Sequence, residues 1–510
     1  MAMDSKQKKA LIILGIIIIA GFLLRVYKLD SQSLWLDEAF SIHYSQQGLM
    51  SVITMQDPTP PLYYSLLHFW IGPTGISVFA TRFLSVVFGT VSIFLVYLLA
   101  KSMFDEKVGL LSALLLALSP LHINYSQEAR AYALFFALIL LSMYFYYRLS
   151  KGNLTKGRAA SKGTIMGYLL STLLLLYSHF YAIFIILAQG LHLAFTSKLK
   201  LSKGFKLSKK IKLWLMLQAV MLIFYTPWLA HVLFMPSNAY SWIPRPSLLQ
   251  IIYMIYSFFS GMAFSFYGLA LTMICLALIL VYARKSRMDE KSSLLWLWVA
   301  VPIIIPFLFS LVFTPIFVPK YVYFASLPLY IMVSKAVFSI NKRRKVAIIA
   351  LIAFLSLASL WVQQNDIMRD PWDRVAGYVS ESYNEGDNVA IINSYQILPF
   401  AYYYENECFR SDDIFGCSQA KGIYPVDNLD QIKAAGKGDF WLIVSRDIYD
   451  DETIRVLDYF NENYNLADSR EYLLNQDSAF FNSLYQYFDQ KKLIQLRLNR
   501  IRVLYFQEKS

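Results

Sequence analysis

The sequence contains few charges and few cysteines. Only 16% of its 510 residues are charged, whereas 57% are hydrophobic, and the mean hydropathy is +0.45. This balance excludes a disordered chain and is typical of a polytopic membrane protein. Of the three cysteines, Cys275 lies in an apolar run and is expected to be a packing residue. Cys408 and Cys417 could form a disulfide if their segment is extracytoplasmic, and with no histidine nearby they do not predict a metal site.

Several features that mark other classes of protein are also missing. No internal repeat and no low-complexity segment is evident. The C-terminal part, from about Pro371, has no glycine-rich phosphate loop and no nucleophile motif. The first apolar run lacks a small-residue cleavage site, so it is expected to be a retained first helix and not a signal peptide.

Acidic and basic residues are unevenly distributed. From Gln363 onward the chain has 24 Asp and Glu against 15 Lys and Arg, whereas the preceding part has 10 acids and 32 bases. The bases of the preceding part lie mainly in the connections between apolar runs. This pattern indicates membrane topology and not a nucleic-acid-binding surface, so no nucleic-acid partner is expected.

A helix needs about 20 apolar residues to cross a bilayer. Runs of this kind predict a polytopic α-helical membrane protein with about eleven transmembrane helices in residues 1–362, followed by a small soluble domain in residues 363–510. The predicted spans are Ala10–Val26, Val78–Ala100, Val108–Leu121, Ala131–Tyr147, Thr164–Ser178, Tyr181–Phe195, Leu213–Phe234, Phe264–Tyr282, Leu294–Phe313, Tyr321–Phe338 and Val346–Val362.

Basic residues predict the orientation of these spans. They cluster before the first span and after the second, fourth, sixth, eighth and tenth, which puts every cluster on one side of the membrane. That side is the cytoplasm by the positive-inside rule. The protein is therefore expected in the cell membrane, with a cytoplasmic N-terminus and an extracytoplasmic C-terminal domain.

The extracytoplasmic side is predicted to carry further structure. Ala39–Met55 and Leu248–Phe259 have the pattern of interfacial helices. Residues 363–510 alternate helical and strand patterns, which indicates a small α/β domain that covers the outer face or binds an acceptor. Its elements are expected at Trp372–Tyr383, Val389–Asn393, Phe440–Val444, Asp451–Tyr464 and Arg502–Phe506.

Acids are rare before Gln363, so those on the outer side are candidates for chemistry. Asp37 and Glu38 follow the first span in the stretch Trp35-Leu36-Asp37-Glu38. Charge beside a membrane is costly unless it is solvated, paired or used. The alternative to a functional pair is a solvated loop, and Asp30, at the end of the first span, is expected to be only an interface charge.

A second acid begins a proline-rich stretch, Asp57-Pro58-Thr59-Pro60-Pro61-Leu62-Tyr63-Tyr64. The prolines stiffen the backbone, so they would hold the carboxylate of Asp57 in place before an aromatic helix that contains Tyr63. The alternative is a connector in which Asp57 caps the next helix.

Glu128, Arg130 and Tyr132 lie at the outer mouth of the fourth span, in Gln127-Glu128-Ala129-Arg130-Ala131-Tyr132. Arginine suits a phosphate because its planar fork donates two parallel hydrogen bonds. The alternative is an internal pairing of Glu128 with Arg130 or with a helix end.

His179, Arg245 and Lys320, the last followed by Tyr321, fall on the same side. Carboxylates and scattered cations around an outward cavity suit a phosphate leaving group opposite a general base. Taken alone, His179 could be a helix-end histidine and Lys320 an interface cation.

With these motifs in this order, the sequence resembles the GT-C superfamily of membrane glycosyltransferases, in the branch of protein O-mannosyltransferases and the lipid A aminoarabinose transferase. The resemblance rests on Trp35-Leu36-Asp37-Glu38, on Asp57-x-x-Pro60-Pro61-Leu62-Tyr63-Tyr64, on the segment 127–132, and on the many-span layout with an outer α/β domain. It implies a hexosyl- or pentosyltransferase of the cell envelope whose donor is a polyprenyl-phosphate sugar. The acceptor would be a protein, lipid or polysaccharide hydroxyl at the outer face of the bilayer.

The resemblance also implies roles for individual residues. Asp37 would be the base that deprotonates the acceptor in an inverting transfer, and Glu38 would orient Asp37 or position the acceptor. Arg130 and Lys320 would bind the lipid phosphate. Asp57 and Glu128 would bind the sugar or acceptor, or hold a divalent cation. The other expected substrate-binding residues, chosen from the sequence itself, are Tyr63, Tyr132, His179, Arg245 and Tyr321, and His179 is a further candidate metal ligand.

Two departures and two alternatives accompany this resemblance. Lys320 stands where arginine is expected before the tyrosine, which keeps the charge but loses the bidentate fork. No DxD-type pair for a nucleotide sugar is evident, which suits a lipid-linked donor.

A transporter or flippase of a lipid-linked or anionic solute is the main alternative, although its ionisable residues would be expected near the midplane. A scaffold that binds partners through its outer domain would leave the acids without a use.

Overall fold

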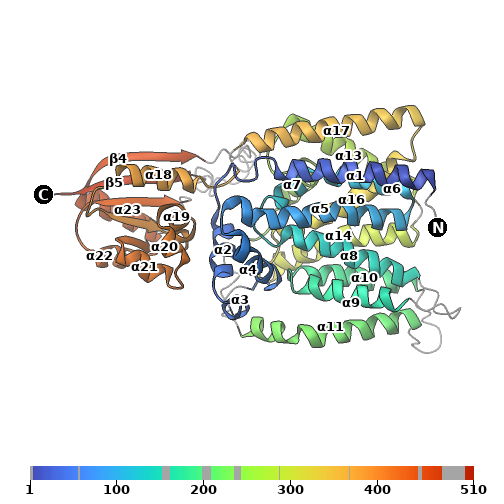
Figure 1. The fold of residues 1–510 in the computed structure, drawn as a ribbon, viewed down its shortest axis with the longest axis horizontal. Coiled ribbons are helices and arrows are strands. Elements are labelled where there is room, and N and C mark those ends of the chain that lie inside the picture. Colours follow the sequence, from blue (N-terminus) through green and yellow to red (C-terminus); the bar gives the residue numbers. More distant parts are fainter. Residues whose placement is uncertain are drawn as a thin grey trace. The chain divides into compact units, whose positions relative to one another are not determined.

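The computed structural model describes residues 4–509 except 55–57, 152–160, 198–207, 235–242, 287, 367, 446–450 and 474–499. The chain forms two compact units (Figure 1). The first, helical unit comprises Met1–Tyr27, Ile53–Leu66 and Arg82–Val362. The second comprises Lys28–Val52, Leu67–Thr81 and Gln363–Ser510, so the C-terminal domain shares its unit with two segments from the N-terminal part of the chain.

Each predicted span coincides with a helix or with consecutive helices. Seven of the described helices are long and apolar enough to cross a membrane, or eight if one bent pair is a single span, so the count of eleven is not confirmed. The helices are α1 (Ser5–Val26), α5 (Val78–Met103), α6 (Glu106–Ala117), α7 (Pro120–Ser126), α8 (Tyr132–Lys151), α9 (Lys162–Leu176), α10 (Ala182–Thr196), α11 (Lys209–Leu233), α12 (Leu248–Ser260), α13 (Phe266–Lys285), α14 (Glu290–Val312), α15 (Pro319–Val322), α16 (Ser326–Val337) and α17 (Lys342–Asn365).

The bent pair is α6 and α7, whose axes differ by 62°. Ser119 caps α7 by accepting a hydrogen bond from His122 N, and Pro120 occupies the first helical position, where a missing N–H costs nothing. The buried guanidinium of Arg25 in α1 donates to two carbonyls at the end of α6, Leu116 O at 3.1 Å and Ala117 O at 3.2 Å. These bonds give both carbonyls a partner at the end of α6, where Leu116 O also accepts from Ser119 N at 3.4 Å.

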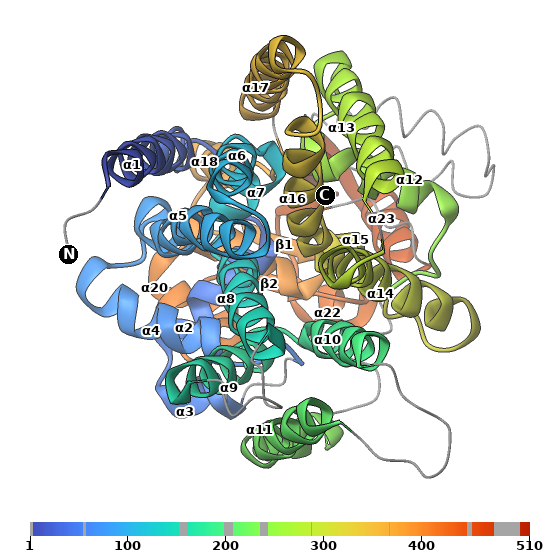
Figure 2. The ribbon, with the colours of Figure 1, turned by 90° about the vertical axis from the view of Figure 1, so that its right-hand side faces the viewer.

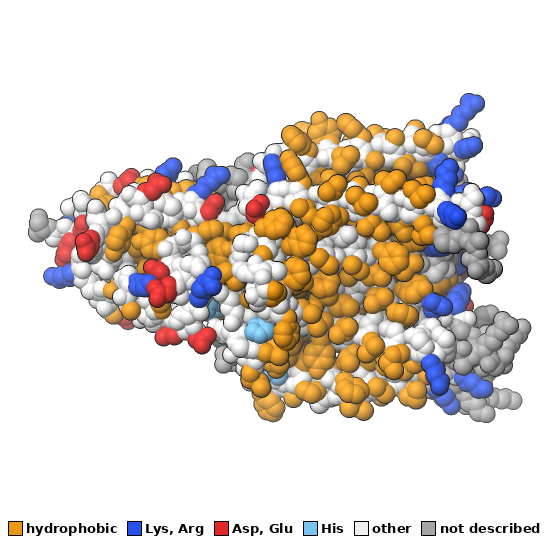
Figure 3. All heavy atoms as spheres, in the orientation of Figure 1, with side chains coloured by type: hydrophobic (Ala, Val, Ile, Leu, Met, Phe, Trp, Pro, Cys, Tyr) orange, Lys and Arg blue, Asp and Glu red, His pale blue; other side chains and the backbone are white. Residues whose placement is uncertain are grey.

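Basic residues from several helices meet at one end of the helical unit. Lys151 at the end of α8 pairs with Glu290 at the start of α14, with Nζ 2.5 Å from Oε2. Lys285 at the end of α13 donates to Ser339 O at 2.9 Å. On the face drawn in Figure 3, basic side chains gather at this end and hydrophobic side chains cover the flanks of the helices. This grouping matches the pattern from which the orientation was predicted, and the orientation itself stays a prediction.

The second unit contains a five-stranded mixed sheet with strand order β2-β1-β3-β5-β4. Its first three strands are parallel, and β5 and β4 are antiparallel to their neighbours. Three strands were predicted, and β2 and β4 were missed because β2 has only four residues and includes Pro425, while β4 is rich in polar residues. The strands are β1 (Asn388–Ile392), β2 (Ile423–Val426), β3 (Phe440–Ser445), β4 (Tyr464–Leu473) and β5 (Arg500–Glu508).

Helices surround this sheet. The two predicted helices are α18 (Trp372–Ser382) and α23 (Asp451–Asn463). Cys408 and Cys417 are joined by a disulfide that links α20 to α21, and Cys275 is buried in α13 as expected of a packing residue. The helices that the sequence did not predict are α19 (Ile397–Tyr404), α20 (Asn406–Arg410), α21 (Ile414–Ala420) and α22 (Leu429–Ala434).

The predicted interfacial helix Ala39–Met55 is wrong as a single element. The chain forms α2 (Leu36–Gln46) and α3 (Leu49–Thr54), because Gln47 is extended and Gly48 follows it. The other predicted interfacial helix coincides with α12. The helix α4 (Leu62–Thr74) follows the proline-rich stretch, as expected.

Candidate active site

The residues selected from the sequence fall into two groups, one in each compact unit. The acid pair Asp37 and Glu38 belongs to the second unit, and the residues from Glu128 to Tyr321 belong to the first. Asp57 lies outside the described residues.

Asp37 and Glu38 occupy the first turn of α2. Trp35 is the N-cap residue, and its carbonyl accepts from Glu38 N at 3.0 Å. Backbone N–H groups are exposed at a helix N-terminus and the helix dipole is positive there, so two carboxylates are favoured at this position. The local sequence therefore places the acid pair without help from distant residues.

The two carboxylates differ in burial. The side chain of Glu38 is fully buried, and its Oε2 lies 3.7 Å from Nη1 of Arg369, whose side chain is 10% exposed. Asp37 is only partly buried. A buried carboxylate that faces a guanidinium is held in place by charge, whereas a partly exposed one is open to another molecule. Arg369 was not predicted, because a lone arginine in an acidic domain carries no local signal.

Hydrogen bonds anchor the segment before α2 within the second unit. Ser33 Oγ donates to Asp370 O at 2.5 Å and accepts from Trp372 N at 3.1 Å. Leu34 N donates to the hydroxyl oxygen of Tyr403 at 2.8 Å. The start of α2 is thus fixed by the segment that leads into α18.

Further along α2, His43 Nδ1 lies 2.9 Å from Phe409 O. Burial lowers the pKa of His43, while the hydrogen bond to Phe409 and the charge of Asp412 oppose this effect. The contact ties the helix to α20 of the same unit.

In the first unit, Glu128 and Arg130 lie in the turn between α7 and α8. Asn124 Nδ2 donates to Glu128 Oε1 at 3.1 Å, and Arg130 N donates to Glu128 O at 2.8 Å. Glu128 is buried, with 7% of its surface exposed. Because α7 begins at the bend that Arg25 stabilises, the position of this turn depends on a buried arginine of α1 that the sequence analysis did not select.

Both tyrosines of α4 lie near Arg130. Arg130 Nη1 donates to Tyr64 OH at 2.9 Å, and its guanidinium carbon lies 5.9 Å from the centre of that ring. Tyr63 is buried and its hydroxyl lies 2.9 Å from Ser85 Oγ, which in turn donates to Arg130 O at 3.4 Å. Tyr64 is therefore a contact of Arg130 that the sequence analysis quoted in a motif but did not select.

His179 is enclosed by aromatic rings. Its ring centre lies 4.7 Å from that of Phe180 in a stacked arrangement, 4.9 Å from that of Tyr321 and 6.2 Å from that of Tyr132. His179 Nδ1 accepts from Tyr181 N at 3.2 Å, so this nitrogen carries no proton in the structure. Burial, together with smaller effects of the charges of Arg130 and Lys320, lowers the pKa of His179 to about 3.

These contacts define one group, which we name the Arg130 cluster: Arg130, Tyr132, His179, Lys320 and Tyr321. Lys320, in the short helix α15, has its Nζ 5.8 Å from the centre of the Tyr321 ring. Its residues come from three parts of the chain that are far apart in the sequence: the start of α8, the turn between α9 and α10, and α15. The structure thus brings together five of the expected substrate-binding residues.

Arg245 does not join this group. It is exposed in the segment before α12, and within the described residues no hydrogen bond or ion pair links it to the cluster.

Among the described residues there is no group of three or more His, Cys, Asp and Glu side chains that could hold a metal ion. The expected metal candidates included Asp57, which lies outside the described part of the chain.

Comparisons with known proteins agree with this architecture. Residues 58–231, which contain Arg130 and His179, match the family model described as dolichyl-phosphate-mannose-protein mannosyltransferase. The structure is similar to apo ArnT from Cupriavidus metallidurans, with a TM-score of 0.60 and 12% sequence identity over 98% of each chain. It is also similar to the same protein bound to undecaprenyl phosphate, with a TM-score of 0.58 and 12% identity over 97% of each chain. No sequence among curated proteins matches the chain.

The structural similarity covers both compact units and shows the fold, while the family match covers the segment that contributes most of the Arg130 cluster. The chain therefore resembles the GT-C superfamily of membrane glycosyltransferases, in the branch that includes ArnT and the protein O-mannosyltransferases.

Proposed function

We propose that this protein transfers a sugar from a polyprenyl-phosphate-linked donor to an acceptor hydroxyl. The observation that carries this proposal is the Arg130 cluster, in which the ring of the buried His179 lies 6.2 Å from that of Tyr132 and 4.9 Å from that of Tyr321. Tyr132 follows Arg130 closely in the chain and Tyr321 follows Lys320, so two cations from distant segments come near one histidine, and two such cations suit one phosphate group.

The phosphate would bind at Arg130 and Lys320. When the bond between the anomeric carbon and the phosphate oxygen breaks, the electron pair stays on that oxygen and the phosphate gains one negative charge. Arg130 and Lys320 would stabilise this charge. Tyr64 holds the guanidinium of Arg130 through its hydroxyl, which limits the rotamers that Arg130 adopts.

Asp37 would supply the base. Its carboxylate accepts the proton of the acceptor hydroxyl while the acceptor oxygen forms the new bond to the anomeric carbon, on the face opposite the leaving phosphate. Attack from that face inverts the anomeric configuration. Glu38, buried against Arg369, would orient the first turn of α2 and would not contact the reacting atoms.

The remaining assignments follow from the same scheme. Glu128 and Asp57 would bind the sugar or acceptor, or a divalent cation if one takes part. Tyr63, Tyr132 and Tyr321 would line the donor site, and Arg245 would meet the donor or acceptor outside the Arg130 cluster. The chemistry would take place at the extracytoplasmic face, with a protein, lipid or polysaccharide acceptor and a hexose or pentose donor.

The decisive experiment uses the purified full-length protein with labelled polyprenyl-phosphate sugars and candidate acceptors. Asp37→Asn should lower kcat by roughly 100-fold to 10,000-fold because general base catalysis contributes about that much. Asp30→Asn is the matched control, since Asp30 is exposed and follows the same span. Full transfer by Asp37→Asn would overturn the role of the base.

Two further readouts test the other parts of the proposal. Nuclear magnetic resonance of the product should show an inverted anomeric configuration, and retention would contradict direct attack. If liposomes show solute flux while no donor is consumed, the protein is a transporter and not a transferase.

A further inference from the structure

At the basic end of the first unit, a cavity of about 180 Å³ opens between the ends of α8, α10, α11 and α14. Its volume is roughly ten times what one water molecule needs. The helices are seen along their axes in Figure 2, with α11 at the rim of the bundle. The polar residues that line the cavity include Ser150, His192, Thr196, Lys209, Lys210 and Glu290.

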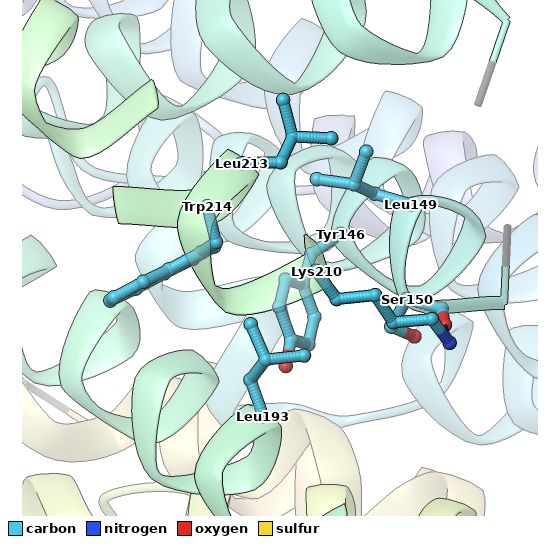
Figure 4. A pocket seen from close by; sticks show the side chains of 7 residues that line it. All are labelled: Tyr146, Leu149, Ser150, Leu193, Lys210, Leu213 and Trp214. Carbon is cyan, nitrogen blue, oxygen red and sulfur yellow. Dashed lines mark hydrogen bonds between the residues drawn. The ribbon is translucent and has the colours of Figure 1, made fainter. Parts of the chain in front are cut away.

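A shallow apolar niche of about 10 Å³ adjoins the cavity. Ser150, Leu193 and Lys210 line both hollows, so the two are continuous. The other residues of the niche are apolar or aromatic and include Leu213 and Trp214 on α11. Figure 4 shows the stem of Lys210 among these side chains and its nitrogen beside Ser150. The niche holds only about one water-sized group, so the apolar part of a larger ligand would lie outside it, along α11.

The cations of the cavity lie in an unusual place on their helix. Lys209 and Lys210 are in the first turn of α11, and that turn has no acidic residue. The helix dipole disfavours cations at a helix N-terminus, so a bound anion would relieve both the dipole and the mutual repulsion of the lysines. Lys210 uses one of its three N–H groups to donate to Ser150 O at 2.5 Å.

One carboxylate also lines the cavity. Glu290 pairs with Lys151 at 2.5 Å, and its charge interacts as well with that of Lys210. The floor of the cavity is rigid, because His192 Nε2 lies 2.8 Å from Glu290 O and its Nδ1 lies 2.7 Å from Tyr146 OH. The lysines of α11 are thus the cations that an added anion would meet.

We propose that the cavity binds the head group of an anionic phospholipid at the basic end of the bundle. The phosphate contacts Lys209 and Lys210, and the acyl chains lie along the outer surface of α11. The observation that favours a lipid is that α11 exposes large apolar side chains directly after these lysines, such as Leu215 and Met216, and continues to do so at Ile223 and Phe224.

This site is separate from the proposed active site. α8 begins at Tyr132 of the Arg130 cluster and ends at Lys151, and its 20 residues span about 30 Å. The lipid site therefore does not depend on the proposed transferase activity, and its test needs no sugar donor.

The test uses the full-length protein in nanodiscs of phosphatidylcholine alone or mixed with phosphatidylglycerol. Thermal unfolding and native mass spectrometry report bound lipid. Wild type should be stabilised by phosphatidylglycerol and retain it. The double variant Lys209→Gln/Lys210→Gln should lose about fivefold in lipid affinity for each lysine removed. Lys342→Gln/Arg343→Gln is the matched control, because it removes two charges from the first turn of α17, away from the cavity.

A second variant separates charge from shape. Ser197→Trp adds a large side chain to the lining of the cavity without changing its charge, and it should also abolish retention of phosphatidylglycerol. The proposal is overturned if both variants retain the lipid as wild type does, or if the control pair loses it equally. It is also overturned if inorganic phosphate in phosphatidylcholine nanodiscs stabilises wild type as much as phosphatidylglycerol does, because the site would then recognise a free anion.

Discussion

Arg369 Nη1 lies 3.7 Å from Glu38 Oε2, and this ion pair is enclosed within the second compact unit. It joins the first turn of α2 to a residue near the start of the C-terminal domain. Because Glu38 is fully buried, its charge depends on Arg369 for compensation. The pair therefore fixes the turn that also contains Asp37.

Arg369→Ala should destabilise the protein by about 3 kcal/mol, because it removes a cation that faces a buried carboxylate. Denaturant unfolding followed by tryptophan fluorescence measures this change. Arg374→Ala is the matched control, since Arg374 is an exposed arginine of the same unit. The double variant Arg369→Ala/Glu38→Gln should regain most of the loss. If the double variant is no more stable than Arg369→Ala, the ion pair is not the cause.

Arg130→Lys should reduce kcat/KM for the lipid-linked donor by roughly 10-fold to 100-fold, because lysine keeps the charge but loses the fork that reaches Tyr64 and a phosphate together. Tyr64→Phe should give a smaller loss, since it removes only the hydroxyl. Lys320→Arg should retain or raise activity. Steady-state kinetics with varied donor tests all three, and full activity of Arg130→Lys would contradict the phosphate assignment.

The stability of the protein should fall as the pH drops below about 6.5, in part because of His179. Burial lowers its pKa from 6.5 to about 3 in the folded state, so between these values the unfolded chain binds a proton that the folded one does not. The contribution is therefore complete above pH 6.5 and is lost as the pH falls toward 3, by up to about 1.4 kcal/mol per pH unit. His43 is shifted in the same direction. The free energy of unfolding, measured at several pH values for wild type and His179→Gln, isolates the contribution of His179. If the two proteins show the same dependence of this free energy on pH, the contribution is refuted.

Gly89→Ala should disturb the bend between α6 and α7. A Cβ at Gly89 would clash with Ser126 Oγ and lie 3.2 Å from Arg25 Nε, where Arg25 already donates to Ser126. We expect a loss of about 1–3 kcal/mol in stability and lower transfer activity. Gly15→Ala is the matched control, because nothing lies within 4 Å of its added Cβ. Equal thermal midpoints for the two variants would show that the close packing at Gly89 is unimportant.

Local sequence patterns predicted the helices well and the sheet incompletely. An apolar run long enough for a bilayer forms a helix because its backbone polar groups have no other partners there, and every predicted span coincides with helical structure. The patterns failed where a few residues decide the outcome. Gln47 and Gly48 divide a predicted helix, and β2 and β4 lack the alternation of a half-buried strand. The predicted count of eleven membrane crossings is not confirmed, because seven of the described helices, or eight with the bent pair, are long and apolar enough to cross a membrane.

The sequence by itself determined the membrane class and the division between a basic helical part and an acidic α/β part, and it suggested which acids and cations to consider for chemistry. These follow from hydropathy and charge, which act locally. Only the tertiary structure decided that Glu38 is buried against Arg369, that Tyr64 holds Arg130, and that Lys320 approaches His179. Such contacts join residues far apart in the chain, so they depend on how the helices pack, which no local pattern encodes.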